Sequence, residues 1–129
     1  MGEFARTFRD LDVSQNALTL VVDVHKFCDS LPKKELYCLA DQMRRASRSV
    51  CSNISEAWRK RRYKAAFISK LSDSEAEAAE MQAWLDVAKA LSYMVPDVYS
   101  DYDSRYEQVL NQLVKSDQRR RQVVPTLKG

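Results

Sequence analysis

Apolar side chains recur at alternating spacings of three and four residues through most of the chain, which is the pattern of helices that bury one face. Asp10 or Asp12 can cap the first such helix by accepting a hydrogen bond from a free backbone N–H. Its apolar stripe consists of Ala17, Val21, Val24, Cys28 and Leu31. The pattern predicts a first helix over about residues 10–31.

Two longer stripes follow. Pro32 suits the first turn of a helix, where its missing N–H is not needed. The second stripe consists of Leu36, Ala40, Met43, Ala46, Val50, Ile54 and Ala57. The third keeps a strict four-three alternation, typical of a coiled-coil seam, and consists of Phe67, Leu71, Ser74, Ala78, Met81, Leu85 and Ala88. The two stripes predict helices over about residues 32–60 and 62–94. The small residues on the seam of the later helix allow a neighbouring helix to approach closely.

Pro96 separates the third helix from a fourth, predicted over about residues 97–117. The register of the fourth is set by Tyr99, Tyr102, Tyr106, Val109 and Leu113. After Asp117 the pattern lapses, and residues 118–129, with Arg119, Arg120 and Arg121, are predicted to be a basic flexible tail. Short connections between long helices favour antiparallel neighbours. We therefore expect an all-α protein, a single domain over residues 1–117 folded as an antiparallel up-down-up-down four-helix bundle.

Composition agrees with an all-helical fold. The only two glycines among the 129 residues are Gly2 and Gly129, whereas sheet proteins need glycine in their turns. No apolar run approaches the ~20 residues of a membrane span, and the N-terminus lacks a signal-peptide core. Cys28, Cys38 and Cys51 are odd in number and form no CxxC motif, which favours reduced thiols. We expect a cytoplasmic protein.

The charge is unevenly distributed, although the formal net charge is only +3. Residues 44–64, RRASRSVCSNISEAWRKRRYK, contain eight basic residues and one acid, Glu56. Between Lys70 and Lys89 the charged residues are all acidic: Asp73, Glu75, Glu77, Glu80 and Asp86. A basic segment followed by an acidic one suggests that the two pair, within one chain or between chains.

The stretch QMRRASRSVCSNISEA, residues 42–57, resembles a motif of bacterial proteins encoded in intervening sequences of 23S ribosomal RNA genes. The family pattern is roughly Q-L-R-R-A-x-x-S-I-P-x-N-I-A-E-G. The outright matches are Gln42, Arg44, Arg45, Ala46, Ser49, Asn53, Ile54 and Glu56. FRDLDVSQNA at residues 8–17 and AKALSYM at residues 88–94 are similar to other family blocks, so the resemblance covers about residues 8–115.

The resemblance implies a helical bundle whose relatives commonly form ring-shaped homopentamers. A related group serves as accessory proteins to reverse transcriptases of diversity-generating retroelements. Three departures from the pattern bear on this chain. Cys51 replaces a proline, so a kink there is weaker; Ala57 and Arg59 stand where glycines are usual, so the next turn is made without glycine; and Gln82 replaces a second glutamate beside Glu80.

The residues give little support to an enzyme. His25, the only histidine, falls between core positions of the first helix, which indicates a boundary or interface residue. The cysteines lack zinc-ligand spacing, a glycine-rich phosphate loop is impossible without glycine, and no Glu-x-x-His pair for a di-metal bundle occurs. We predict no catalytic residue, no metal and no cofactor.

Two sets of candidate site residues remain. Arg44, Arg45, Asn53, Glu56 and Glu80 are interpreted as a polar network or subunit interface that fixes register, with either arginine bonding Glu56, Glu80 or a carboxylate of another subunit. A ligand or phosphate site at a subunit junction is the alternative. The candidate nucleic-acid contacts are Arg48, Arg59, Lys60, Arg61, Arg62 and Lys64.

For the run of basic residues from Arg59 to Lys64, the alternative is a solvated charged turn at a helix end, where cations are favourable. Repeated around a ring, the run would bind phosphates without base readout, and Trp58 and Tyr63 beside it could stack on unpaired bases. The leading hypothesis is a non-enzymatic homo-oligomer, pentameric by resemblance, that binds RNA or DNA non-specifically. The alternative is a protein–protein adaptor, for example to a reverse transcriptase, that docks its partner through the acidic third helix or the Trp84 side.

Overall fold

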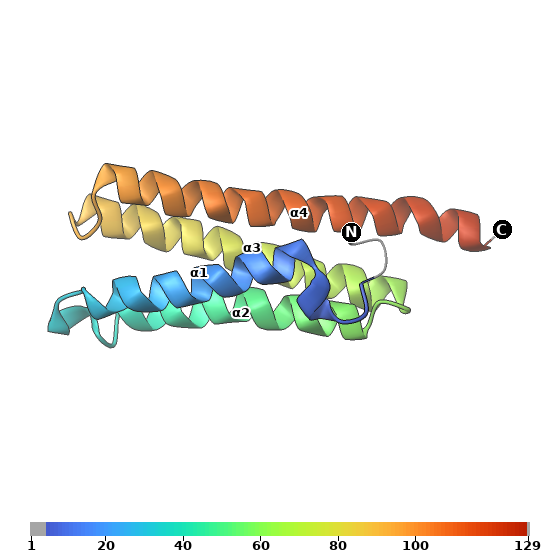
Figure 1. Cartoon of the computed structure of the whole chain (residues 1–129), viewed down its shortest axis with the longest axis horizontal. Helices are drawn as coiled ribbons and strands as arrows, with labels where there is room; N and C mark the ends of the chain where they lie inside the picture. The colour runs from blue at the N-terminus through green and yellow to red at the C-terminus, as the bar shows by residue number, and fades with distance from the viewer. Residues whose placement is uncertain (1–4, 129) are drawn as a thin grey trace.

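The chain is all-helical over the part that the structure, a computed structural model, describes: residues 5–128, with side chains for residues 5–117. Four α-helices, α1 (Asp12–Asp29), α2 (Leu39–Arg59), α3 (Lys64–Ala90) and α4 (Pro96–Lys128), are accompanied by two short 3₁₀ turns, η1 (Phe8–Asp10) and η2 (Lys33–Glu35). No strand occurs in this range. Successive helices run in opposite directions (Figure 1), which confirms the antiparallel up-down-up-down bundle.

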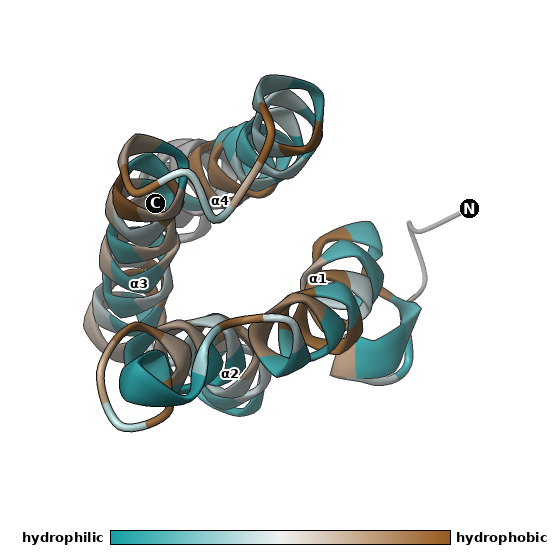
Figure 2. Ribbon diagram, turned by 90° about the vertical axis from the view of Figure 1, so that its left-hand side faces the viewer, coloured by the Kyte–Doolittle hydropathy of each residue, from teal (hydrophilic) through white to brown (hydrophobic). Residues whose placement is uncertain are grey.

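The helices follow one another around the bundle, with α2 and α3 between α1 and α4 (Figure 2). The α2–α3 pair shares the most extensive contact, and α1 and α4 share the least of the neighbouring pairs. Polar bonds link α1 to α4: Asn16 Nδ2 donates to Gln112 Oε1 at 3.1 Å, and Arg105 Nη2 donates to Asp23 Oδ2 at 2.7 Å. The weakest neighbouring contact is therefore reinforced by side-chain hydrogen bonds.

The core consists of the predicted stripes. Of the α3 seam, all residues from Leu71 to Ala88 are buried, and Phe67 at its start is partly buried. The α2 stripe is buried from Ala40 to Ala57, but Leu36 is exposed. Ser74 Oγ donates to the backbone carbonyl of Val50 at 2.9 Å, so the polar member of the seam is satisfied inside the core.

The second helix begins later than predicted. Pro32 has an extended backbone (φ −65°, ψ 154°) and precedes the single 3₁₀ turn η2, so it does not start α2. The start is fixed instead by Glu35, whose carboxylate accepts a hydrogen bond from the Leu39 N–H at 3.3 Å and another from the Tyr93 hydroxyl at 2.8 Å. A proline that suits the first turn of an α-helix suits a 3₁₀ turn equally, so the pattern alone could not separate the two.

The third helix ends at Ala90, four residues earlier than predicted. Ser92 has φ 63°, the left-handed conformation, and it is the only non-glycine residue with positive φ in the described chain. The Ser92 N–H donates to the Lys89 carbonyl at 3.0 Å and the Tyr93 N–H to the Ala88 carbonyl at 2.8 Å. These two bonds form a Schellman motif, which satisfies carbonyls at the helix end.

The fourth helix differs from its prediction after Asp117, because its backbone continues as helix to Lys128. The sequence at residues 118–122 is QRRRQ, and arginine and glutamine are good helix formers, so loss of the apolar pattern does not by itself end a helix. The side chains of Arg119, Arg120 and Arg121 lie outside the described residues. None of the described helices combines the length and the apolar run that a membrane crossing needs.

Two tyrosines of α4 are buried in contrasting ways. The Tyr102 hydroxyl donates to the Asp23 backbone carbonyl at 2.9 Å. Tyr106 is 0% exposed, and its hydroxyl has no hydrogen-bond partner within residues 5–117. Burial raises the pKa of both phenols, because the ionised form would lose its hydration. Tyr106 thus contributes packing at the cost of one unsatisfied polar group.

We expect Tyr106→Phe to raise the free energy of unfolding by about 1 kcal/mol, because it removes a buried hydroxyl that has no partner while keeping the ring. The matched control, Tyr102→Phe, should lower it by about 1 kcal/mol, because it removes a satisfied hydrogen bond. Urea denaturation of both variants at neutral pH measures the difference. A loss of stability in Tyr106→Phe equal to that in Tyr102→Phe would contradict the assignment.

The left-handed Ser92 gives a second prediction. Ser92→Gly should stabilise the fold by up to about 1 kcal/mol, because a residue with a Cβ is strained at positive φ and glycine is not. Ser100→Gly, at an exposed position inside α4, should destabilise it by about 0.5 kcal/mol, because glycine disfavours helix interiors. Thermal unfolding followed by circular dichroism compares the two variants, and equal shifts would argue against a left-handed Ser92.

Candidate nucleic-acid interface

The α2–α3 connection presents the basic run at one end of the bundle. The Lys60 N–H donates to the carbonyls of Glu56 and Ala57 at 3.0 and 3.1 Å, and the Tyr63 N–H to that of Lys60 at 2.9 Å. Lys60 itself has φ −96° and ψ 13°, so the chain reverses without any left-handed residue. The expectation that this turn is made without glycine is confirmed, and the reversal points consecutive basic side chains into solvent.

Five of the predicted contacts gather here, and we call them the basic turn: Arg59, Lys60, Arg61, Arg62 and Lys64. Lys64 is partly buried and the other four are exposed. Within the described side chains, none of the five lies within ion-pair distance of a carboxylate, although the flanks of the adjoining helices are rich in such pairs. The basic turn is therefore a concentration of uncompensated positive charge.

Arg48 is exposed and also unpaired in the described region, but it lies on α2, eleven residues before Arg59. At 1.5 Å per residue that is about 16 Å along the helix axis, so the fold does not bring Arg48 into the basic turn. It could contact only a ligand that extends along α2.

The N-terminal segment adds a cation that the sequence pattern did not reveal. Arg6, Thr7 and Phe8 line a cleft of about 450 Å³ together with residues of the α2 end: Ser55, Glu56, Trp58 and Arg59. Thr7 holds this segment in place by capping η1, with its hydroxyl accepting from the Arg9 N–H at 3.1 Å. Arg6 is exposed and is distant from the basic turn in sequence, so only the fold shows that the two are neighbours.

The two aromatic residues beside the basic turn differ in accessibility. Trp58 is partly buried, and the Arg61 guanidinium carbon lies 4.1 Å from its ring centroid while Arg61 Nη1 donates to the Trp58 carbonyl at 2.8 Å. Tyr63 is 62% exposed. The Arg62 guanidinium carbon is 5.9 Å from its ring centroid, near the limit of a cation–π contact. Tyr63 therefore presents the more accessible ring.

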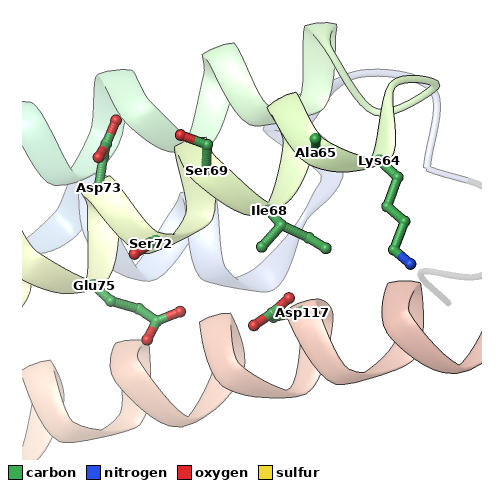
Figure 3. A pocket seen from close by; sticks show the side chains of 8 residues that line it. All are labelled: Lys64, Ala65, Ile68, Ser69, Ser72, Asp73, Glu75 and Asp117. Atoms are coloured by element: carbon green, nitrogen blue, oxygen red, sulfur yellow. The ribbon is translucent and has the colours of Figure 1, made fainter.

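A groove of about 550 Å³ between α3 and α4 begins beside the basic turn (Figure 3). Lys64 and Ile68 point from α3 toward α4, and Glu75 and Asp117 place their carboxylates between the two helices (Figure 3). Asp73 also belongs to its lining. These acids disfavour phosphate, so the positive surface ends at Lys64 and does not continue into the groove.

The predicted polar network is present as separate groups. Arg45 Nη1 donates to Glu77 at 3.2 Å, and its Nη2 bonds Glu80, as one predicted pairing required. The hydrogen bonds that Arg45 donates to Glu80 and Glu77 raise its pKa, because they favour the charged guanidinium. Arg44 instead reaches α1, where its Nη2 donates to Asp29 at 3.3 Å, and its buried Nε has no partner in the described chain. The two arginines thus point to different flanks of α2, as expected.

Neither arginine bonds Glu56 in this chain. The partner of Glu56 is Lys70. Lys70 Nζ lies 2.9 Å from Glu56 Oε1, donates to Asn53 Oδ1 at 3.4 Å, and is 3.7 Å from Asp73 Oδ2. The Glu56 carboxylate raises the pKa of Lys70 by favouring its charged form. Lys70 was not among the predicted site residues, although its i,i+3 spacing to Asp73 was a signal. Glu56 therefore pairs with a residue of α3 and forms no ion pair with a cation of the basic turn.

Gln82, the departure from a family glutamate, bridges α3 and α4. Its Nε2 donates to Glu107 Oε1 at 3.1 Å. A glutamate at position 82 would bring a second carboxylate toward Glu107, and like charges at that distance repel. The amide therefore has a structural use here. Glu80 accepts a further hydrogen bond from Trp84 Nε1 at 3.1 Å, so the indole N–H of Trp84 already has a partner within α3.

The remaining reactive groups do not converge. His25 is exposed on α1. The three cysteines are free thiols: Cys28 is buried, Cys38 exposed and Cys51 intermediate, and burial raises the pKa of Cys51 to about 11. Among the described residues, no three His, Cys, Asp or Glu side chains are arranged to hold a metal ion. The helix α2 continues without interruption through Cys51, the position of the family proline.

The fold has a counterpart among solved structures. A protein of unknown function from the S23 ribosomal protein family of Bacteroides thetaiotaomicron matches with a TM-score of 0.75 and 22% sequence identity, over 82% of this chain and 95% of that one. At this identity the likeness supports the fold alone. A comparison with curated protein sequences returned no match.

A family model provides the stronger result. The model described as 23S rRNA-intervening sequence protein matches residues 9–115. That span nearly coincides with the region of the motif resemblance, and it includes α1, α2 and α3 completely and α4 as far as residue 115. Because the match covers most of the sequence, this chain belongs to the family of 23S rRNA-intervening sequence proteins.

Proposed function

We propose that this chain is a non-enzymatic, self-associating protein that binds RNA or DNA non-specifically through its basic turn. The observation that carries the proposal is the local imbalance of charge. Five cations lie within six residues, and none has an ion-pair partner in the described region. Such a surface attracts the phosphate backbone of any sequence, because the interaction releases condensed counterions and reads no base edges.

The position of these cations in the fold supports the proposal. The first turn of α3 holds no acid, and its first residue is Lys64. Acids are the stabilising choice at a helix N-terminus, by about 0.3–1 kcal/mol each, and cations there oppose the helix dipole. A sequence selected for stability alone would place a carboxylate at this turn. Arg59 and Lys60, at the end of α2, are favourably placed by the same rule, so the solvated-turn interpretation accounts for only part of the run.

Self-association would increase the effect. The family resemblance implies a ring of five copies, and the basic turns of several copies at one end would attract one polyanion together. A contact that is weak in one copy becomes strong when several copies share one strand, because each later contact is intramolecular. We therefore propose that the homo-oligomer is the form that binds nucleic acid.

We expect Arg59→Ala/Arg61→Ala/Arg62→Ala to weaken binding to single- and double-stranded RNA and DNA. It should also reduce the slope of log affinity against log salt concentration by about 2 to 3, since each lost phosphate contact contributes about 0.7–0.9. The matched control is Lys26→Ala/Lys33→Ala/Lys34→Ala, which removes the same charge from exposed positions at the opposite end. Fluorescence anisotropy over a salt series measures both quantities.

Equal losses in the two triple variants would show that only net charge matters and would contradict the assignment to the basic turn. Unchanged binding in the first variant would contradict it outright. Light scattering on the same samples gives the mass of the assembly. A mass near the 14.9 kDa of one chain would contradict self-association.

A second function, a protein–protein adaptor, is favoured by a separate observation. Exposed aliphatic side chains gather around the α3–α4 connection, at the opposite end from the basic turn (Figure 1): Val87, Leu91, Val95 and Val98. Exposed apolar clusters commonly mark protein contacts. The acidic α3 and the Trp84 side, which the sequence suggested, are weaker candidates, because Arg45 and Glu80 already occupy them.

If the adaptor function holds, the protein should recover one partner from a nuclease-treated lysate. Leu91→Ser/Val95→Ser should abolish that recovery, because it makes the cluster polar without touching the core. Val22→Ser/Val114→Ser, which changes exposed apolar residues on α1 and α4, is the control and should leave it intact. If the unmodified protein recovers the partner from an untreated lysate but not from a nuclease-treated one, the two are instead joined through nucleic acid.

A further inference from the structure

The side chain of Tyr63 is exposed and has no packing role in the core of the fold. Its side chain is 62% exposed and does not belong to the apolar side chains that pack on the core. Its hydroxyl has no hydrogen-bond partner among residues 5–117. Its structural role is that of the N-cap residue of α3, and only its backbone fills it: the Tyr63 N–H donates to the Lys60 carbonyl, and the Tyr63 carbonyl accepts from the Phe67 N–H, both at 2.9 Å. The exposed part of an aromatic ring contributes nothing to hydrophobic stabilisation, because that part is not removed from water. The ring is therefore available to a ligand at the loss of no more than its distant contact with the Arg62 guanidinium.

The charges around Tyr63 define what that ligand is. The residues before and after it in the chain are Arg62 and Lys64, with Lys60 and Arg61 one turn earlier. None of these cations has a carboxylate partner in the described side chains. An accessible ring flanked by cations matches a nucleotide, whose planar base stacks on the ring while its phosphates lie between the charges.

Trp58 is less suitable for the same task, although it lies in the same basic segment. Arg61 covers its ring at 4.1 Å and is held there by a hydrogen bond to the Trp58 carbonyl. Stacking on that face would require Arg61 to leave. Arg62 lies 5.9 Å from the Tyr63 centroid, where a cation–π contact is weak and easily displaced. Of the two aromatic residues, the structure favours Tyr63.

We propose that Tyr63 is a stacking platform for an unpaired base, so that the basic turn prefers single-stranded RNA or DNA to a duplex. The inference rests on the proposed function, because the cations provide most of the affinity. A base in a duplex has both faces covered by its neighbours, whereas a single strand can turn one base onto the ring. Phosphate contacts alone would not produce this preference.

The test compares the wild-type protein with Tyr63→Ala and Tyr63→Phe on a fluorescein-labelled 12-nucleotide single strand and on the corresponding duplex. Tyr63→Ala should weaken single-strand binding by about 5- to 150-fold, the range for one lost base–aromatic stack. It should leave duplex binding and the salt slope unchanged, because no charge is removed. Tyr63→Phe should bind like the wild type, because it keeps the ring.

Two controls separate stacking from other causes. Tyr37→Ala removes a ring that is 86% exposed at the opposite end of the bundle, and it should have no effect. A single strand with abasic sites keeps its phosphates but has no bases, so on it the wild type and Tyr63→Ala should bind equally. A Tyr63→Ala effect that persists on the abasic strand would overturn the stacking assignment.

The outcomes also separate this inference from the proposed function. If Arg59→Ala/Arg61→Ala/Arg62→Ala loses binding but Tyr63→Ala binds single strands like the wild type, the stacking platform is wrong and the basic turn stands. If the wild type binds neither single strand nor duplex at low salt, both proposals are wrong. A single-strand preference that Tyr63→Ala abolishes supports both.

Discussion

The close contact between α2 and α3 is the constraint on which the rest of the structure depends. It is made by small side chains, among them the fully buried Ala46 and Ala78, and by the hydrogen bond from Ser74 to the Val50 carbonyl. A serine at a seam position is unfavourable unless its hydroxyl finds an acceptor, and here the acceptor is the backbone of the facing helix. Because this bond joins the middle of one helix to the other, it fixes their relative register. The position of the turn that connects the helices follows from that register.

The same register separates two kinds of charge. Along the facing flanks, Arg45 meets Glu77 and Glu80, and Lys70 meets Glu56, so the basic segment and the acidic segment neutralise each other where they lie side by side. The acidic stretch of α3 begins only at Asp73, more than two turns after the helix starts. Among the described side chains, no ion pair joins Asp73, Glu77 or Glu80 to the basic turn, although Lys64 lines the α3–α4 groove together with Asp73. A small net charge of +3 is thus compatible with a strongly positive end.

The bundle was predictable because its stripes are long and regular: the α3 seam alone fixes a buried face from Leu71 to Ala88. The pairing of Arg45 with Glu80 was predictable as one of several options, since both residues flank their seams. The partner of Glu56 was not, because the choice between Arg44, Arg45 and Lys70 depends on the rotation of two helices about their axes. The contribution of Arg6 was also hidden, because periodicity carries no information on where a non-helical segment lies. The start of α2 was predicted wrongly because the hydrogen bond from the Leu39 N–H to Glu35 that fixes it does not alter the spacing of apolar residues.

Charge at one end of a bundle has a consequence for self-association. If several copies align their basic turns, the cations of neighbouring copies repel one another, and this repulsion opposes the burial of apolar surface that holds the copies together. A bound polyanion removes the repulsion, so assembly and nucleic-acid binding must favour each other by the same free energy in both directions. The proposed stacking on Tyr63 would add an interaction that salt does not screen, because stacking involves no counterion release. Phosphate contacts would then determine how many copies engage a strand, and the aromatic ring would determine which form of the strand is retained.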